Sequence, residues 1–345
     1  MTVRPVDGCI KCGACVRECP VLRQEGPERF PGPRRLAVEG PRFNAELAAL
    51  RGPLSLCTTC ARCSSVCPSG LPLPEALVRV RSLLQGDRPE GQRRMLENVD
   101  RTLRTVLPER EEIAPREGDL AFFPGCIAHG RLPEETAASL ALLEATGARP
   151  YVPRDWACCG SPLEKIGEPD RLERVRQKNA GLLSGVGEIV ASCPGCTVQL
   201  RNAYHKDAWH LLEYLHRTGL PAGRFAPPAH AVKVALHRPC HLARVVGPHT
   251  MDMARELLEA VPGVTVVEHE GEDECCGGGG GVAASCPEAS LRMAERKLRS
   301  ARRSGAAILL APCPFCVLNL RRAGGMEVQE LSVFLAGMLS HSNKP

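Results

Sequence analysis

Cysteine thiols are the side chains of this sequence best suited to chemistry, and the most distinctive two are adjacent. Cys275 and Cys276 are followed directly by five glycines, Gly277 to Gly281. A disulfide between neighbouring cysteines is strained, so the pattern predicts that these two thiols bind a metal. Glycine tolerates positive φ and lets the backbone approach a bulky group closely. The stretch therefore predicts a pair of ligands held against tightly packed backbone.

Three more cysteines complete a five-cysteine pattern, and this pattern occurs twice. The first copy consists of Cys126, Cys158, Cys159, Cys193 and Cys196, and the second of Cys240, Cys275, Cys276, Cys313 and Cys316. Corresponding cysteines lie 114 to 120 residues apart. This indicates an internal repeat with a period of about one small domain.

Eight earlier cysteines form two runs with the spacing Cys-x2-Cys-x2-Cys-x3-Cys-Pro. They are Cys9, Cys12, Cys15 and Cys19, then Cys57, Cys60, Cys63 and Cys67. Three thiolates on one tight turn can hold three corners of an iron–sulfur cubane, and the fourth cysteine of each run reaches the other cluster. The predicted ligand sets are Cys9, Cys12, Cys15 and Cys67 for one [4Fe–4S] centre, and Cys19, Cys57, Cys60 and Cys63 for the second. Two zinc knuckles are the disfavoured alternative, because eight cysteines share this double spacing.

The composition favours a metalloprotein of a reducing compartment. The chain has 345 residues, which suggests two or three domains, and 19 cysteines with only 3% aromatic residues. A formal charge of +5, which leaves out ligated thiolates, gives no reason to expect a nucleic-acid partner. No apolar run approaches the roughly 18 residues that span a bilayer, and no signal-peptide core precedes Cys9. We expect a cytoplasmic protein, with any attachment to the inner membrane face made through a partner.

Apolar runs and helical periodicity surround the cysteines. Strands are predicted at 119–123, 188–192, 232–236, 264–267 and 307–311, and helices at 43–50, 72–84, 89–107, 134–146, 170–183, 251–261 and 287–303. Ligands of α/β units collect where strands end, so the five cysteines of each copy are expected to converge there. A final apolar stripe is expected to be core, and it comprises Leu331, Phe334, Leu335 and Met338.

The doubled Cys…Cys-Cys-Gly…Cys-x2-Cys pattern behind two ferredoxin motifs resembles the CCG-domain proteins over essentially the whole chain. His237-x2-Cys240-His241-Leu242 and the Cys275 to Gly279 stretch are similar to characteristic pieces of that family's second repeat. The family includes heterodisulfide reductase subunits of the B and D types. It also includes the iron–sulfur subunits of glycolate oxidase and anaerobic glycerol-3-phosphate dehydrogenase.

The resemblance implies an α+β chain in four parts. These are an α-helical ferredoxin domain with two [4Fe–4S] clusters at 1–85, a helical and charged linker at 86–118, and two tandem α/β CCG domains at 119–220 and 231–340. It also implies that each five-cysteine set binds an iron–sulfur cluster of the unusual non-cubane type. Arg238 stands where many relatives carry an acidic residue.

Other residues carry weaker signals. Cys286 lies outside all four sets and is expected to be an ordinary buried residue. His129 and His241 follow lead cysteines, and they either hydrogen-bond to cluster sulfurs or are ordinary loop histidines. Trp156 and Phe315 are expected to shield clusters from water rather than to contact substrate.

Two functions fit these patterns, and no catalytic residue is assigned within either. The first is an iron–sulfur oxidoreductase subunit that exchanges electrons with a flavoprotein or other redox subunit through the cubanes. Its CCG-bound clusters would carry out disulfide or thiol redox chemistry. The second is a non-catalytic relay that passes electrons from a flavin dehydrogenase of the glycolate, lactate or glycerol-3-phosphate type to quinone. The run Gly277 to Gly281 follows cysteines and lacks the strand–helix context of a dinucleotide site, so electrons must enter from a separate protein. A zinc-bound structural or nucleic-acid module is disfavoured.

Overall fold

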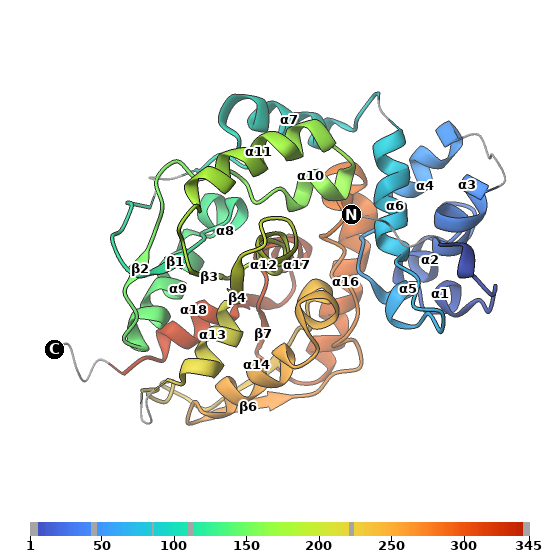
Figure 1. Ribbon diagram of the computed structural model, residues 1–345. Helices are drawn as coiled ribbons and strands as arrows, with labels where there is room; N and C mark the ends of the chain where they lie inside the picture. The colour runs from blue at the N-terminus through green and yellow to red at the C-terminus, as the bar shows by residue number, and fades with distance from the viewer. Residues whose placement is uncertain (1–5, 43–46, 85, 110–112, 221–223, 341–345) are drawn as a thin grey trace.

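The computed structural model describes residues 6–42, 47–84, 86–109, 113–220 and 224–340. The first part is built of short helices, shown in blue at one side of the molecule in Figure 1. They are η1 (Val6–Gly8), α1 (Ala14–Arg17), α2 (Pro20–Glu25), η2 (Arg35–Glu39), α3 (Gly40–Arg42), η3 (Leu47–Leu50), α4 (Arg51–Ser55), α5 (Arg62–Ser65) and α6 (Leu73–Leu83). Helix α6 confirms the prediction at 72–84. The helix predicted at 43–50 is a 3-10 turn over its second half, and 43–46 lie outside the described residues.

One longer helix, α7 (Glu90–Thr102), links this part to the rest of the chain and runs along the edge of the molecule in Figure 1. The prediction of a helix to residue 107 was wrong at its C-terminal end. Leu103 takes a left-handed conformation (φ 58°) and ends the helix. The backbone then turns inward, and the Leu103 carbonyl accepts a hydrogen bond from the Cys158 N–H at 2.9 Å.

Two four-stranded parallel sheets follow, and they have the same topology. The first has the order β2-β1-β3-β4 and the second β6-β5-β7-β8. Their strands are β1 (Leu120–Phe122), β2 (Pro150–Tyr151), β3 (Glu188–Ala191) and β4 (Asp207–His210), then β5 (Val232–Leu236), β6 (Val264–Val267), β7 (Ile308–Ala311) and β8 (Glu327–Glu330). The five predicted strands are all present. Strands β2, β4 and β8 were not predicted from the sequence.

Helices cover both sheets, and several begin with a proline that needs no backbone partner at the first helical position. The first repeat contains α8 (Cys126–Arg131), α9 (Pro133–Ala145), α10 (Ser161–Ile166), α11 (Pro169–Leu182), α12 (Pro194–Asn202) and α13 (Leu211–Thr218). The second contains η4 (Leu242–Val246), α14 (Thr250–Glu259), α15 (Val282–Ser285), α16 (Pro287–Arg303), α17 (Pro314–Ala323) and α18 (Leu331–Gly337). The four helices predicted in these repeats correspond to α9, α11, α14 and α16.

The two repeats share one hydrophobic core along a pseudo-twofold arrangement. Helix α9 of the first repeat packs on α18 of the second, and α13 packs on α14 in the equivalent way. Leu142, Leu215, Leu258 and Leu335 are fully buried in this shared core. Burying one such side chain contributes about 1.5–3 kcal/mol relative to leaving it exposed. The C-terminal stripe is therefore core, as predicted.

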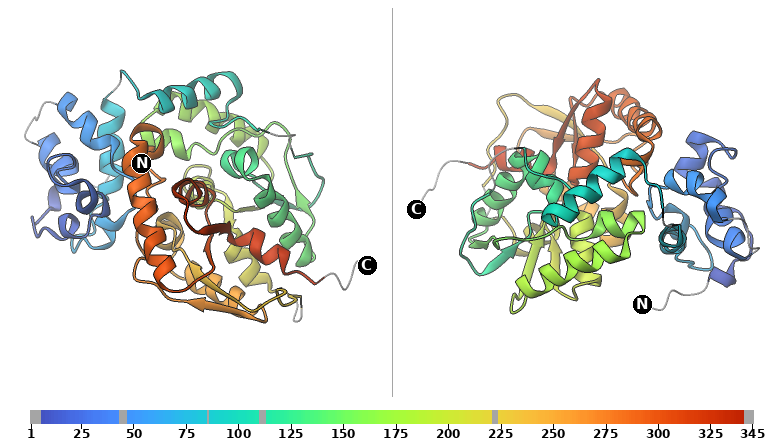
Figure 2. Two further views of the ribbon diagram at one scale, coloured as in Figure 1. Left: turned by 180° about the vertical axis from the view of Figure 1, so that it is seen from behind. Right: turned by 90° about the horizontal axis from the view of Figure 1, so that it is seen from above.

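The helical N-terminal part rests on the second repeat. In Figures 1 and 2 it lies beside the long helix α16 in each view. A bidentate ion pair joins Arg292 of α16 to Glu25 of α2 at 2.7 Å, and a single contact joins Arg62 of α5 to Asp273 at 2.7 Å. Within the ranges that the structure covers, every helix is too short or too polar to cross a membrane.

Candidate iron–sulfur sites

The first ferredoxin set lies at the surface of the N-terminal helical part. Cys9, Cys12, Cys15 and Cys67 line one small depression, and Cys12 is exposed. The loop reaches this shape because Lys11 and Gly13 take positive φ (58° and 78°) just before α1. Burial and the neighbouring Cys9 raise the pKa of the Cys15 thiol. The four sulfurs predicted to share a cluster thus lie together.

The second ferredoxin set is buried. Cys19, Cys57, Cys60 and Cys63 have little exposure and belong to one apolar cluster. Thr59 and Ala61 repeat the positive-φ pattern of the first loop. Burial, followed by the neighbouring thiols, raises the pKa of Cys63. Thiols that oppose one another's ionisation in this way suit a cationic group that would hold them all as thiolates.

The first five-cysteine set gathers at the C-terminal ends of the first sheet. Its five thiols are all buried. Cys126 begins α8 after β1, Cys193 precedes α12 after β3, and the Cys158–Cys159 pair lies on the loop between them. Hydrogen bonds from Cys126 and Cys159 lower the pKa of Cys158 well below its ordinary value. This convergence at the strand ends is the arrangement expected from the sequence.

The second set repeats the arrangement on the second sheet. The sulfurs of Cys276 and Cys316 are 3.2 Å apart. The N–H groups of Gly277 and Gly278 lie 3.4 Å from the sulfurs of Cys275 and Cys276. Hydrogen bonds from Cys275 and Cys316 lower the pKa of Cys276 well below its ordinary value. The donor chemistry of each set, five converging thiols of which two have a lowered pKa, fits an iron–sulfur cluster.

The glycine run after Cys276 packs against backbone from another part of the chain. A Cβ atom on Gly280 (φ 64°) would lie 2.2 Å from the carbonyl oxygen of Cys57, and one on Gly279 would lie 2.9 Å from that of Thr58. One on Gly281 (φ 79°) would lie 2.6 Å from Ile166 of the first repeat. Any side chain here would separate the ferredoxin loop from the second CCG set. The close approach predicted for this run is therefore present.

A buried arginine ties the same junction together. The Arg81 guanidinium donates hydrogen bonds to the carbonyls of Cys57 (2.7 Å), Lys165 (2.6 Å) and Gly280 (3.0 Å). It also donates to the carbonyl of Leu54. One side chain thus joins the ferredoxin part to both repeats.

This junction brings two ligand sets into direct contact. The Cys275 thiol lies close enough to Cys60 to be the largest cause of the raised pKa of Cys60. Cys240 and Cys275 also belong to the apolar cluster that surrounds the second ferredoxin set. The second repeat is therefore adjacent to the ferredoxin cysteines through thiols of its own set.

The two CCG sets face each other across one cavity of about 320 Å³. It is lined by all five cysteines of the first set and by Cys240, Cys276, Cys313 and Cys316 of the second. Met95 of α7, Ile166 of α10 and Phe315 of α17 form parts of its apolar wall, and His241 and Lys165 are polar lining groups. Clusters held by these cysteines would therefore share one space.

The weaker candidates have distinct surroundings. His241 lies in the cavity wall with Nδ1 3.5 Å from the Cys240 sulfur. His129 and Phe123 instead make T-shaped contacts with the buried Trp156, with ring centroids 5.4 and 5.7 Å away. Trp156 thus belongs to the packing behind the first set, whereas Phe315 lines the cavity. Cys286 is only half-buried, contrary to the prediction, because it lies at the junction with its sulfur 3.4 Å from the Ser55 hydroxyl.

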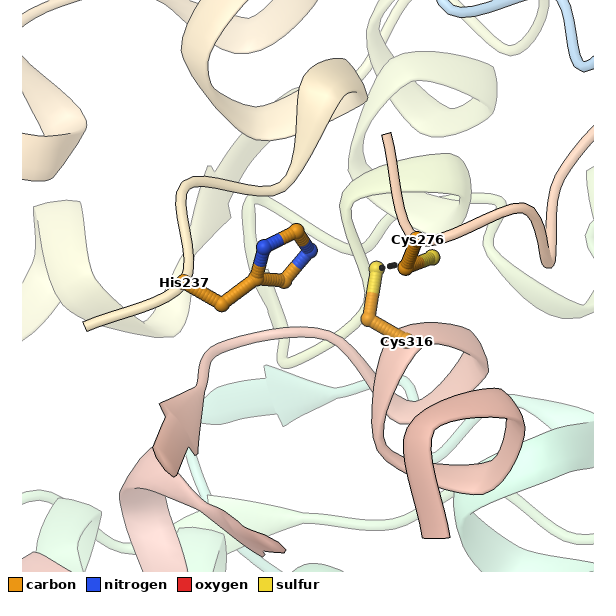
Figure 3. A group of neighbouring side chains, drawn as sticks. All are labelled: His237, Cys276 and Cys316. Atoms are coloured by element: carbon orange, nitrogen blue, oxygen red, sulfur yellow. Dashed lines mark hydrogen bonds between the residues drawn. The ribbon is translucent and has the colours of Figure 1, made fainter. Parts of the chain in front are cut away.

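Three residues near the sites were missed from the sequence, and a fourth, His237, was named only as part of a motif and without a role. Thr105 lies with its hydroxyl 3.7 Å from the Cys158 sulfur, and Arg104 stacks over Trp156 at 4.4 Å. Lys297 is fully buried and donates hydrogen bonds to the carbonyls of the 271–274 loop. His237 shares a space with Cys276 and Cys316 (Figure 3). Lys297 had a signal, because a lysine falls on the apolar stripe of α16.

Comparisons with known proteins follow the same division of the chain. Residues 120–201 and 234–321 match the cysteine-rich domain known as CCG, and residues 5–71 match the 4Fe-4S dicluster domain. A relative from Methanothermobacter marburgensis, the B-type subunit of fumarate reductase (CoM/CoB), is 31% identical over 333 residues, which cover 91% of this chain and 67% of the relative. The chain belongs to the CCG-domain iron–sulfur proteins.

Two other relatives of this CCG protein come from different complexes. The D-type subunit of the dihydromethanophenazine:CoB–CoM heterodisulfide reductase of Methanosarcina acetivorans is 26% identical, with 98% of this chain and 95% of the relative covered. The probable glycolate oxidase iron–sulfur subunit of Bacillus subtilis is 23% identical, with 94% and 90% covered. The CCG protein is thus an iron–sulfur redox protein related to oxidoreductase subunits.

A solved structure shares the fold. The crystal structure of a hypothetical protein from Helicobacter pylori superposes with a TM-score of 0.62 at 10% identity. The superposed region covers 94% of this chain and 70% of the Helicobacter pylori chain. The likeness extends over the N-terminal helical part and both repeats.

Proposed function

We propose that this protein reduces a disulfide, or oxidises two thiols in the reverse direction, in the cavity between its two CCG repeats. Breaking one S–S bond consumes two electrons and two protons and releases two thiols. The observation that carries the proposal is that nine of the ten CCG cysteines line one cavity of about 320 Å³, so that clusters held by the two sets would face each other. A disulfide bound between two such clusters could receive one electron from each of them.

The cysteines would hold four clusters. In this proposal Cys9, Cys12, Cys15 and Cys67 hold one [4Fe–4S] cubane, and Cys19, Cys57, Cys60 and Cys63 hold the other. The five cysteines of each CCG repeat hold a further cluster of the non-cubane type. Bound iron–sulfur clusters supply electrons one at a time.

The spatial order of the four cysteine sets supports entry of electrons at the ferredoxin part. Cys12 is exposed at the surface, and its neighbour Ile10 is 67% exposed, which is unusual for a large apolar side chain. This surface would receive a flavoprotein or another redox subunit. Cys60 and Cys275 join the ferredoxin sets to the second repeat. The first repeat then lies across the cavity, at the far end of the series.

Side chains around the cavity can contact and hydrogen-bond the two sulfurs of a disulfide. The His241 ring is held beside Cys240 and lines the cavity, so it is positioned to hydrogen-bond a product thiol. The apolar wall from Met95, Ile166 and Phe315 excludes water, which strengthens each polar interaction made inside. The sequence similarity to a heterodisulfide reductase subunit supports the same class of reaction.

A relay is the second candidate, and the similarity to a probable glycolate oxidase iron–sulfur subunit favours it. In this alternative a flavin dehydrogenase supplies electrons, and quinone or another carrier accepts them. The protein would then turn over no disulfide by itself. The cavity would only separate two relay centres.

Thiol release by the anaerobic, cluster-loaded full chain distinguishes the two functions. The probe is bis(2-hydroxyethyl) disulfide with reduced methyl viologen as the electron donor. The half-buried Ala283 lines the cavity, so Ala283→Phe fills part of it without removing a ligand. We expect Ala283→Phe to slow thiol release at least about tenfold, equivalent to about 1.4 kcal/mol of barrier.

Ala180→Phe is the matched control, because Ala180 is exposed on α11 and does not line the cavity. It should release thiol at the wild-type rate. Absence of thiol release from the loaded wild type, together with quinone reduction when a flavoprotein is added, would establish the relay. Stoichiometric zinc in place of iron would exclude both candidates.

A further inference from the structure

His237 lies at the end of β5, three residues before the lead cysteine of the second CCG set. One of its ring nitrogens and the sulfurs of Cys276 and Cys316 all lie within 4.8 Å of one another. Figure 3 shows the three side chains converging from three separate segments. Metal–sulfur and metal–nitrogen bonds are about 2.0–2.3 Å long, so one ion could bind all three atoms after a small side-chain movement.

The His237 ring is fully buried without a polar partner. Neither ring nitrogen has a hydrogen-bond partner among the residues that the structure describes. An unsatisfied buried polar group costs about 1–3 kcal/mol, so native proteins rarely leave one without a function. The two sulfurs are the nearest chemically matched atoms, and both belong to the predicted ligand set.

The polar groups around His237 are already engaged. The Lys297 ammonium has three donors, and all three go to carbonyls of Gly271, Glu272 and Glu274. The His269 ring nitrogens lie against the Ser300 hydroxyl at 3.2 Å and the Leu236 carbonyl at 3.3 Å. His269 is therefore satisfied within the protein, whereas His237 is not.

The first repeat has a phenyl ring at the same place. The Phe123 N–H donates to the Val190 carbonyl at 2.8 Å, and the His237 N–H donates to the Leu310 carbonyl at 2.8 Å. Each residue thus directly follows the first strand of its sheet and pairs with the equivalent neighbouring strand. Phe123 packs on Trp156. The same backbone site therefore carries an apolar ring in one repeat and a potential nitrogen ligand in the other.

We propose that His237 donates a ring nitrogen to the metal centre of the second CCG set. That centre would then be held by imidazole and thiolates together, while the first is held by thiolates alone. Imidazole suits iron as well as zinc and copper. Histidine in place of thiolate raises the reduction potential of an iron–sulfur centre, so the two CCG centres would differ in potential. His237 has this role if the second set binds iron, whichever reaction the cavity supports.

Pulsed electron paramagnetic resonance on the full chain labelled with ¹⁵N-histidine tests this assignment. The spectra are recorded in a Cys159→Ser background, which disables the first set. We expect a strong nitrogen coupling that changes between ¹⁴N- and ¹⁵N-histidine, persists in His269→Gln, and is lost in His237→Phe. The His237→Cys centre, in which a thiolate replaces the imidazole, should have a lower reduction potential than the wild-type centre.

Two measurements keep the outcomes distinct. Iron analysis reports whether the second set is loaded, and a second set without iron would refute the proposed function as well. Loaded iron without nitrogen coupling in the wild type would refute only the role of His237. His237→Cys supplies a thiolate in the same place, so it should retain iron without nitrogen coupling even if His237→Phe fails to assemble.

Discussion

The two CCG repeats have the same strand order and the same five cysteines, yet their surroundings differ. The second repeat touches the ferredoxin cysteines through Cys275, and its glycine run lies directly on the ferredoxin loop. The first repeat has Ser161 and Pro162 in place of that run, and it meets the ferredoxin part away from the cysteines, where α10 packs on α6. The two repeats thus share the ligand set, but only the second lies against the ferredoxin cysteines themselves.

The residues behind each set differ as well. Asn179 of α11 and Lys297 of α16 both lie ten residues after the proline that begins their helix, and both are buried. Asn179 holds the backbone of Ala157 and Cys158, whereas Lys297 places a cation behind Cys276 and Cys316. Because the second repeat has His237 at the place where the first has Phe123, the surroundings of the second set are the more polar. Because the same five cysteines lie in different surroundings in the two repeats, the two CCG centres should have different reduction potentials and different roles.

Removing equivalent ligands should have unequal effects, and this is the largest expected difference. Cys275→Ser and Cys158→Ser should each lose about a quarter of the iron if every centre holds four irons. Cys275→Ser should also leave the first CCG centre unreduced by a donor that enters at the ferredoxin part. Cys158→Ser should leave the second centre reducible. Iron analysis with low-temperature spectra during reduction measures both, and equal behaviour of the two variants would contradict this order of sets.

The cost of close packing at the glycine junction can be measured separately from the cost of ordinary backbone strain. Gly280→Ala adds a Cβ 2.2 Å from the Cys57 carbonyl at φ 64°. We expect a cost of about 3 kcal/mol or more from the left-handed conformation and overpacking together. Gly185 has a similar φ of 76° with open space around it, so Gly185→Ala should cost only about 1–2 kcal/mol. Denaturant unfolding under anaerobic conditions gives both values. Equal losses would show that close packing at the junction contributes nothing.

Equivalent helix caps in the two repeats should respond oppositely to pH. Burial raises the pKa of Glu330 to about 7, and burial lowers the pKa of His210 to about 4. The contribution of neutral Glu330 to folding stability is fully present below about pH 4.5 and is lost as the pH rises through about 7. The contribution of neutral His210 to folding stability is fully present above about pH 6.5 and is lost as the pH falls through about 4.

Replacing the carboxyl should therefore stabilise the protein at alkaline pH. Glu330→Gln keeps an acceptor for the Ser332 N–H, and it should add about 2–3 kcal/mol at pH 8 with little change at pH 4.5. Urea unfolding at the two pH values measures the difference. A gain of the same size at both would contradict a buried, titrating Glu330.

The smallest expected effect concerns the aromatic support of the first set. The Arg104 guanidinium lies 4.4 Å over Trp156, and Nε donates to the Trp156 carbonyl at 3.2 Å. Arg104→Gln should destabilise the protein by about 1–2 kcal/mol because a largely desolvated cation–π contact is lost. Arg217→Gln is the control, since Arg217 stacks on Trp209 at 4.3 Å but is 40% exposed. Its cost should be smaller, and the reverse ranking in thermal unfolding would refute the role of desolvation.

Much of the fold was predictable where the sequence pattern is local. Val232 to Leu236 and Ala307 to Ala311 are apolar runs followed by cysteines, so both strands and their ligand ends were recognisable. Strand β2 contains only Pro150 and Tyr151, and β4 and β8 mix polar and apolar residues, so none of them has a clear apolar signal. The end of α7 was mispredicted because Leu103 adopts its left-handed turn only where its carbonyl accepts the Cys158 N–H.

Residue types and spacing alone determined the four cysteine sets, the duplication and the family. They could do so because ligands that share one loop or one strand end are fixed by chain geometry over a few residues. Tertiary structure alone decided that Cys60 meets Cys275, that both repeats line one cavity, and that His237 faces Cys276 and Cys316. These contacts join segments about 40 to more than 200 residues apart. Their formation depends on how separately folded layers pack, which no local spacing encodes.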